Sequence, residues 1–274
     1  MKKYWDIILV LVIVIITVVI YFKPNDNGKI KILFIGNSLT FQNNMPTIFK
    51  GIAILNGKKV YVEDCAKAKE TIFGHSNRDE VKNAIESQDW DYVILQGSSR
   101  EFLRDSSFIH NKTLPALERI ITMIKKNNPN TKMLFYMTWA YRDGYKPVKE
   151  SNTFLKMANK INSQYLKLSK KYNIGVVPVG MAWKDSRNIR RDVNLYFKDG
   201  IHPSLKGSYL TAFCFYAAIF NECPVGTNYY GKLGARLCYY LQSVAEKNVM
   251  LHRKKYRLEG IGIDEIEKKE NLMH

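Results

Sequence analysis

Short apolar runs alternate with amphipathic stretches along the chain from residue 31 onward. The apolar runs predict buried strands over 31–35, 60–63, 92–95, 132–138 and 174–179. The other stretches show helical spacing and predict helices over 45–56, 78–87, 117–126, 151–172, 205–220 and 233–249. Strands that alternate with helices are typical of a parallel sheet with helices on both faces. The pattern therefore predicts an α/β fold, a three-layer α/β/α sandwich around a sheet of about five parallel strands.

The first 22 residues follow a different pattern, because Trp5 to Phe22 is almost wholly apolar. This length is just enough for a helix to span the hydrocarbon of a bilayer. The run is longer than that of a usual signal peptide and no A-x-A-like cleavage site follows it, which favours an uncleaved signal anchor over a cleaved peptide. Lys2 and Lys3 would then stay cytoplasmic, with the body of the protein outside.

The rest of the 274 residues suffices for one α/β domain of ordinary size. No internal repeat and no second apolar core interrupts it, and the pattern carries no signal for an oligomeric state. The expected units are a transmembrane signal anchor over 1–22, a polar linker over 23–30, a catalytic domain over 31–250 and a charged tail over 251–274.

The chain is strongly basic, with a formal net charge of +17. Such an excess can attract an anionic partner, such as nucleic acid, anionic lipid or an acidic glycan. It can also reflect a lysine-rich, solvated surface, and the scattered positions of the basic residues favour this second interpretation. Because there is no nucleic-acid-binding motif and no basic stripe interleaved with aromatic residues, we expect no nucleic-acid partner.

The four cysteines do not form a metal-binding pattern. None has CxxC spacing and no histidine lies at metal-finger spacing, so no metal site is expected. Cys214 and Cys238 lie in apolar, predicted helical stretches, which favours buried free thiols. A single bridge from Cys214 or Cys223 to Cys238 stays open if the domain faces an oxidising compartment.

Three polar features lie where parallel sheets bind ligands, at the carboxyl ends of strands. Ser38 follows the first strand; taken alone, it is more simply a turn or helix-capping serine. Asp199 lies three residues before His202 on a loop, so it can hold one imidazole nitrogen while the other accepts a proton from a serine. Gln96 closes the third strand, where its amide can donate to an oxyanion or cap the sheet edge.

Together these segments resemble the sequence blocks of the SGNH (GDSL-like) hydrolase superfamily. Gly36-Asn37-Ser38 is similar to the first block, which carries the nucleophile, and Asp199-Gly200-Ile201-His202 is similar to the last. Gln96-Gly97-Ser98-Ser99 looks like the Gln-Gly-Glu-Ser form of the third block in acetylesterase-type members. That leaves Gln96 and Ser99 as candidates for the oxyanion hole, and Gln96 is preferred. Over 31–224 the chain resembles one poorly characterised bacterial branch.

The second block departs from the pattern. Thr71 to His75 fits the end of a Gly-Gly-x-Ser/Thr-Leu-x-x-His block, but Ala68 and Lys69 occupy the glycine positions. A backbone N–H survives any side chain except that of proline, so Lys69 can still donate, although it lacks the backbone freedom of glycine. His75 is either a structural histidine or a substrate contact. The candidate substrate contacts are Asn37, His75 and Ser99.

The resemblance implies a flavodoxin-like SGNH fold and a serine esterase that needs no cofactor. Ser38 would attack the acyl carbon, His202 would take its proton and Asp199 would orient the imidazole. For proton transfer, Ser38 Oγ and a His202 nitrogen should lie about 2.6–3.2 Å apart. The N–H groups of Ser38 and Lys69, with Gln96, would hold the oxyanion. The expected substrate is an acetyl ester on a glycan, either of the bacterial cell envelope or of the diet. The alternatives are an O-acyltransferase and a non-catalytic glycan-binding protein.

Overall fold

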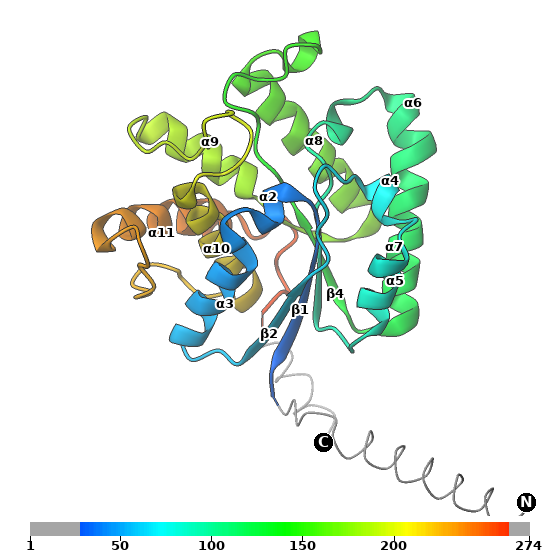
Figure 1. The fold of residues 1–274 in the computed structure, drawn as a ribbon, viewed down its shortest axis with the longest axis horizontal. Helices are drawn as coiled ribbons and strands as arrows, with labels where there is room; N and C mark the ends of the chain where they lie inside the picture. Colours follow the sequence, from blue (N-terminus) through cyan, green and yellow to red (C-terminus); the bar gives the residue numbers. More distant parts are fainter. Residues whose placement is uncertain (1–27, 263–274) are drawn as a thin grey trace, which may run out of the picture.

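A central parallel sheet organises the molecule, which the computed structural model describes over residues 28–262 (Figure 1). Its five strands lie in the order β2-β1-β3-β4-β5, and all neighbouring pairs are parallel. The strands are β1 (Ile30–Ile35), β2 (Val60–Asp64), β3 (Tyr92–Leu95), β4 (Lys132–Tyr136) and β5 (Gly175–Val177). The predicted five-stranded parallel sheet is therefore confirmed.

Helices cover both faces of this sheet, which confirms the three-layer sandwich (Figure 1). One layer contains α3 (Met45–Leu55), α9 (Val179–Ile189), α10 (Leu205–Phe220) and α11 (Ala235–Val249). The other contains α5 (Asp79–Glu86), α7 (Leu114–Asn127) and α8 (Phe154–Tyr172). Single turns of helix are α2 (Ser38–Phe41), α4 (Ile72–His75) and α6 (Ser106–Phe108), with 3-10 or π turns at Gln42–Asn44, Glu101–Leu103, Ile109–Thr113, Lys149–Ser151 and Met250–His252.

The strand order reverses beside β1, and this reversal places the site. From β1 the chain first runs outward to β2, then returns to β3 and continues to β4 and β5. Open α/β sheets bind ligands at the carboxyl ends of the strands where the order reverses. The segments that follow β1 and β3 meet at that point.

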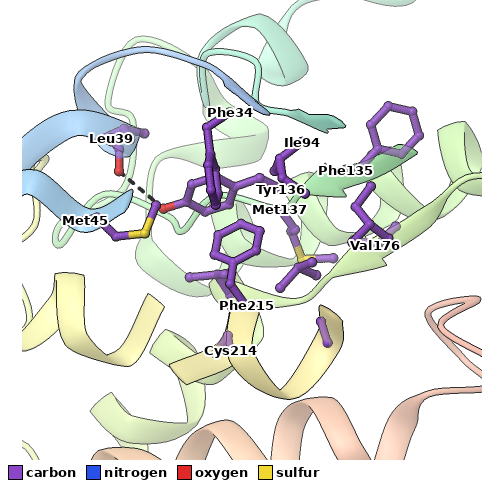
Figure 2. Packing of buried hydrophobic residues seen from close by; sticks show 14 of the residues in the cluster. Phe34, Leu39, Met45, Ile94, Phe135, Tyr136, Met137, Val176, Cys214 and Phe215 are labelled. Carbon is purple, nitrogen blue, oxygen red and sulfur yellow. Dashed lines mark hydrogen bonds between the residues drawn. The ribbon is translucent and has the colours of Figure 1, made fainter. Parts of the chain in front are cut away.

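Aromatic rings fill the core between β1, β4 and α10 (Figure 2). Phe215 packs edge-on against Phe34 and Tyr136, with ring centroids 5.1 and 4.9 Å apart. The central strand β3 is covered on both faces and is accordingly a continuous apolar run rather than an alternating one. The Tyr136 hydroxyl donates to the carbonyl oxygen of Leu39 at 3.2 Å, so the core also holds the turn after β1.

Helix α9 differs from the sequence-based prediction. The strand expected over 174–179 ends at Val177, and Val179 begins α9. Pro178 has no N–H for the strand ladder, so it ends β5, and it occupies the position just before the helix. Gly180 permits the tight packing that follows, since a Cβ there would lie 2.2 Å from the carbonyl oxygen of Thr138. The β-branched residues of the segment had favoured a longer strand.

The charged tail expected from residue 251 begins later in the structure. Tyr256 and Leu258 are buried, with 1% and 0% of their surface exposed. The carbonyl oxygen of Tyr256 accepts a hydrogen bond from Val176 N at 2.8 Å, so this segment covers the free edge of β5. The expected anchor over 1–22, most of the linker and the chain from 263 lie outside the described residues. Among residues 28–262, no helix is both long and apolar enough to cross a bilayer.

All four cysteines are free thiols. Cys214 and Cys238 are buried in α10 and α11, as the favoured interpretation expected. Cys223 is exposed, and its thiol donates to a carboxylate oxygen of Glu246 at 3.1 Å. The structure therefore contains neither form of the bridge that the sequence left open.

Candidate active site

Ser38 lies on the first turn after β1, and Asn37 holds that turn in place. The Asn37 side chain caps α2 by accepting a hydrogen bond from Leu39 N at 3.1 Å. Its amide nitrogen donates to the carbonyl oxygen of Glu70 at 2.9 Å. Only 3% of the Asn37 surface is exposed. Both polar ends of this candidate substrate contact are therefore engaged by the chain itself.

Gln96 lies beneath the same turn and is fully buried. Its side-chain oxygen accepts hydrogen bonds from Asn37 N at 2.8 Å and Thr40 Oγ1 at 2.9 Å. Its side-chain nitrogen donates to the carbonyl oxygen of Gly97. A Cβ on Gly36 would lie 2.6 Å from the Gln96 side-chain oxygen, so a glycine is needed there. The structure thus differs from the expectation that Gln96 donates to the oxyanion: its amide joins β3 to the nucleophile turn.

The imidazole of His202 joins Ser38 to a carboxylate. His202 Nε2 lies 2.9 Å from Ser38 Oγ, and His202 Nδ1 lies 2.5 Å from Asp199 Oδ2. Both distances satisfy the geometric expectation for a Ser-His-Asp arrangement. With the Nδ1 proton donated to the carboxylate, Nε2 is left to accept the proton of the Ser38 hydroxyl.

The Asp199 carboxylate is held in its ionised form. Its partial burial acts to raise the pKa, but hydrogen bonds from the His202 ring and from the N–H groups of Ile201 and His202 outweigh this and hold the pKa below its usual range. Asp199 Oδ1 accepts those two N–H groups at 2.9 and 3.0 Å. An ionised Asp199 stabilises the positive charge that His202 gains when it takes a proton.

The loop that carries Asp199 and His202 is braced by the segment after β4. Gly200 has a φ of 70°, which favours glycine, and its carbonyl oxygen accepts a hydrogen bond from Arg142 N at 2.8 Å. The indole N–H of Trp139 donates to the carbonyl oxygen of Ile201 at 2.9 Å. The His202 carbonyl accepts from Phe197 N at 2.8 Å. The imidazole is therefore positioned by a rigid loop.

Lys69 keeps the backbone shape of the glycine that it replaces. Its φ of 64° is in the left-handed region, which costs a residue with a side chain about 1–2 kcal/mol. Such strain is typical of functional positions. Among residues 28–262, no acceptor meets the N–H of Lys69 or that of Ser38. Both residues line one cavity, so both N–H groups are available to an oxyanion.

His75 lies behind the nucleophile turn and is fully buried. Its Nε2 lies 2.8 Å from the carbonyl oxygen of Gly36, and its Nδ1 lies 3.3 Å from an Arg78 nitrogen. Burial is the main cause that lowers the pKa of His75 to about 4; Glu70 opposes the shift and Arg78 supports it. A neutral ring that donates to Gly36 and accepts from Arg78 fits both contacts. The structure gives His75 the structural role rather than contact with a substrate.

A cavity of about 440 Å³ opens above Ser38 and His202. Ser99 reaches it, but its hydroxyl donates to Thr138 Oγ1 at 2.9 Å and is 1% exposed. The other lining residues come mainly from the loops after β2, β3 and β4: Lys69, Ser98, Arg100, Tyr141, Gly144, Tyr145, Lys146 and Pro147. Within the described range, no cluster of His, Cys, Asp or Glu is placed to hold a metal ion.

Sequence reasoning missed Arg100, Lys146 and the two tyrosines of this lining. They belong to no recognisable block and lie in loops without apolar periodicity. The one signal for them is positional, because loops at the carboxyl ends of parallel strands carry binding residues.

Comparisons with known proteins agree with this architecture. The family described as a domain of unknown function (DUF4886) matches residues 35–236. No curated protein matches the chain in sequence. A solved DUF4886 family structure from Bacteroides uniformis ATCC 8492 has 17% identity and a TM-score of 0.71, and covers 81% of this chain and 95% of its own.

Two further solved structures share the fold. A proposed SGNH hydrolase from Slackia heliotrinireducens is 25% identical with a TM-score of 0.53, over 68% of this chain and 97% of its own. An acetyl xylan esterase is 18% identical with a TM-score of 0.54, over 70% of this chain and 100% of its own. The resemblance to a poorly characterised branch of the SGNH hydrolases is confirmed, and the chain belongs to the DUF4886 family.

Proposed function

We propose that this protein is a serine esterase that hydrolyses carboxylic esters, with Ser38 as nucleophile, His202 as base and Asp199 as the residue that orients the base. The observation that carries the proposal is the continuous hydrogen-bonded chain from Ser38 Oγ through His202 to Asp199, at 2.9 and 2.5 Å. It lies at the reversal of strand order and opens into a cavity. A binding protein would not need this alignment.

The proposed reaction has two halves. Ser38 Oγ attacks the acyl carbon while its proton moves to His202 Nε2, and the tetrahedral intermediate expels the alcohol, which takes that proton. Water then gives a proton to His202 and attacks the acyl group on Ser38. The carboxylic acid leaves as Ser38 Oγ recovers its proton.

The oxyanion of each intermediate is held by the N–H groups of Ser38 and Lys69, which no other group engages in the described structure. Gln96 supports this arrangement from below, since its side-chain oxygen fixes Asn37 N next to the nucleophile. We propose an acetyl ester on a glycan as the substrate. The support is the acetyl xylan esterase that shares the fold, and two tyrosines, Tyr141 and Tyr145, that can pack against sugar rings.

The test is hydrolysis of p-nitrophenyl acetate by the full chain in detergent. Ser38→Ala and His202→Ala should each lower kcat by at least about 10³-fold, and the double variant should be no worse, because the two groups act in one step. Ser243→Ala, which removes a half-buried hydroxyl on α11 that is not part of the cavity lining, serves as the matched control. Activity that survives in Ser38→Ala would exclude the proposed nucleophile. In the same assay with a glycan added as acceptor, acyl transfer would yield an acetylated glycan in place of free acetate.

We also retain the proposal of a membrane anchor over 1–22 that places the domain outside the cytoplasm. Its support is the apolar run itself. The full chain should sediment with membranes, and a chain that starts at Lys29 should not. N-terminal sequencing of mature protein that begins near residue 25 would show cleavage instead.

A further inference from the structure

The cavity above Ser38 is lined by positive charge alone. Its charged lining residues are Lys69, Arg100 and Lys146, and no carboxylate of residues 28–262 lines it. Each comes from a different loop, after β2, β3 and β4 respectively. All three are exposed, so their charges face solvent and any molecule that enters. Three segments far apart in sequence thus bring cations to one opening.

Among residues 28–262, these three cations form no ion pair with a carboxylate, unlike several cations elsewhere on the surface. Arg142 pairs with Asp143, and Lys171 pairs with Glu118. Lys146 Nζ donates to the carbonyl oxygen of Asn152, at 3.0 Å, and not to a carboxylate of the described residues. Uncompensated cations in a hollow concentrate the electrostatic potential there and attract anions.

The positive lining continues into an adjoining hollow of about 590 Å³, which shares Lys69 and Arg100. It adds Arg104 and Lys160. Its acids are Glu101, Asp105 and Glu150. Glu101 is buried and accepts hydrogen bonds from Ile72 N and Thr113 Oγ1, and Asp105 caps α6 by accepting from Phe108 N. Asp105 and Glu150 are exposed and oppose the cations, but the four cations of this hollow still outnumber its three acids.

We propose that the site selects esters that also carry an anionic group, a carboxylate or a phosphate, close to the scissile bond. This inference rests on the proposed esterase function and narrows its substrate class. Arg100 offers a planar pair of donors that matches a carboxylate or phosphate, and the two lysines add point charges. The anion can belong to the alcohol part, as in an O-acetylated acidic sugar, or to the acyl part, as in a half-ester of a dicarboxylic acid.

Two matched pairs of esters distinguish whether the anion belongs to the alcohol part or to the acyl part of the substrate. The first pair is an O-acetylated methyl glucuronoside and its neutral carboxamide; the second is monoethyl glutarate and neutral ethyl glutaramate. For the full chain, kcat/KM by pH-stat should be at least about tenfold higher for the anionic member of one pair. The pair that shows the difference identifies which part of the ester carries the anion. Equal or lower values for the anionic member of both pairs would overturn the proposal.

Substitutions of single cations test which residues cause the preference for anionic esters. Arg100→Gln and Lys146→Gln should each reduce the ratio of anionic to neutral kcat/KM by about tenfold, since each removes a charged contact. Arg236→Gln and Lys82→Gln remove exposed cations on α11 and α5, away from the cavity, and should leave the ratio unchanged. A ratio that survives the double change of Arg100 and Lys146 would contradict the assigned residues, as would an equal fall in the controls.

A binding measurement keeps this inference separable from the proposed hydrolysis. Calorimetry with Ser38→Ala should show tighter binding of the anionic than of the neutral member of the pair that shows the kcat/KM difference, and Arg100→Gln should remove the difference. Hydrolysis that persists in Ser38→Ala would refute the proposed nucleophile alone. Equal binding of the two members of each pair, together with equal kcat/KM in both ester pairs, would refute anion selection alone.

Discussion

Gln96 connects three groups around the nucleophile through one buried side chain. Its oxygen accepts hydrogen bonds from Asn37 N and Thr40 Oγ1, and its nitrogen donates one to the Gly97 carbonyl oxygen. The amide is too deeply placed to reach an oxyanion in this structure, since none of its surface is exposed. Its contribution to activity therefore acts through the position of the turn that carries Ser38.

Gln96→Ala should lower both stability and kcat. It leaves the Asn37 N–H and the Thr40 hydroxyl without their acceptor, so the free energy of unfolding should fall by about 1–3 kcal/mol. Gln96→Glu keeps the acceptor, but its carboxylate is buried and replaces the N–H that donates to the Gly97 carbonyl, so its stability should fall as well. Urea denaturation checks this. Wild-type stability in Gln96→Ala together with a kcat loss of about 10²–10³-fold would instead support a direct oxyanion contact.

His75 should make the protein less stable in mild acid. Its folded pKa of about 4 lies below the unfolded value of about 6.5, so the unfolded state binds the proton first. The stability from His75 is complete above pH 6.5 and is lost as the pH falls toward 4, by about 3 kcal/mol in all. The unfolding free energy of wild type minus that of His75→Gln should shrink over this interval. A difference independent of pH would contradict the prediction.

At the scale of elements, α9 depends on a glycine that touches another segment. Gly180→Ala would place a Cβ 2.2 Å from the backbone oxygen of Thr138, which cannot move without disturbing the turn after β4. We expect a loss of at least about 1–3 kcal/mol in unfolding free energy, despite the higher helix propensity of alanine. Asn188→Ala on the exposed side of α9 is the control and should change stability little. Equal melting temperatures for the two variants would contradict this packing.

The elements that the sequence predicted are those whose signal is local. The strands β1 and β3 are short apolar runs, and α10 follows a clear capping serine, Ser204. Helix α9 was missed because its first residues are β-branched or glycine, and the packing that favours a helix comes from Thr138 in the distant segment after β4. Propensity is a weak guide where contacts between distant segments decide the conformation.

The residues of the site also fall into two groups, those that the sequence predicts and those whose positions depend on the fold. Ser38, Asp199 and His202 were found because their spacing and neighbours form recognisable blocks. The depth of Gln96 and the loops that bring Arg100 and Lys146 together depend on the fold of the whole sheet. The sequence around these residues contains no periodic signal from which their positions could be derived.

At the scale of the whole molecule, the segment after α11 closes the sheet. A chain that ends at residue 249 would expose Val176 N and remove the buried side chains of Tyr256 and Leu258. We expect a loss of about 3–6 kcal/mol in unfolding free energy, from two buried side chains at about 1.5–3 kcal/mol each. A chain that ends at residue 262 keeps these contacts and is the matched control. Urea denaturation that finds the two truncations equally stable would show that the segment is dispensable.

The left-handed backbone of Lys69 affects how the range of esters that this enzyme accepts can change in evolution. A glycine there would relieve about 1 kcal/mol of strain in the folded chain, and the freedom it adds to the unfolded chain would offset much of that gain. Selection for folding stability therefore favours neither lysine nor glycine strongly at position 69. If anionic esters are the substrates, an enzyme that loses this lysine would accept neutral esters nearly as well as anionic ones. Lys69→Gly should therefore lower the ratio of kcat/KM for anionic esters to that for neutral esters. Substrate range could then drift among relatives while the fold stays equally stable.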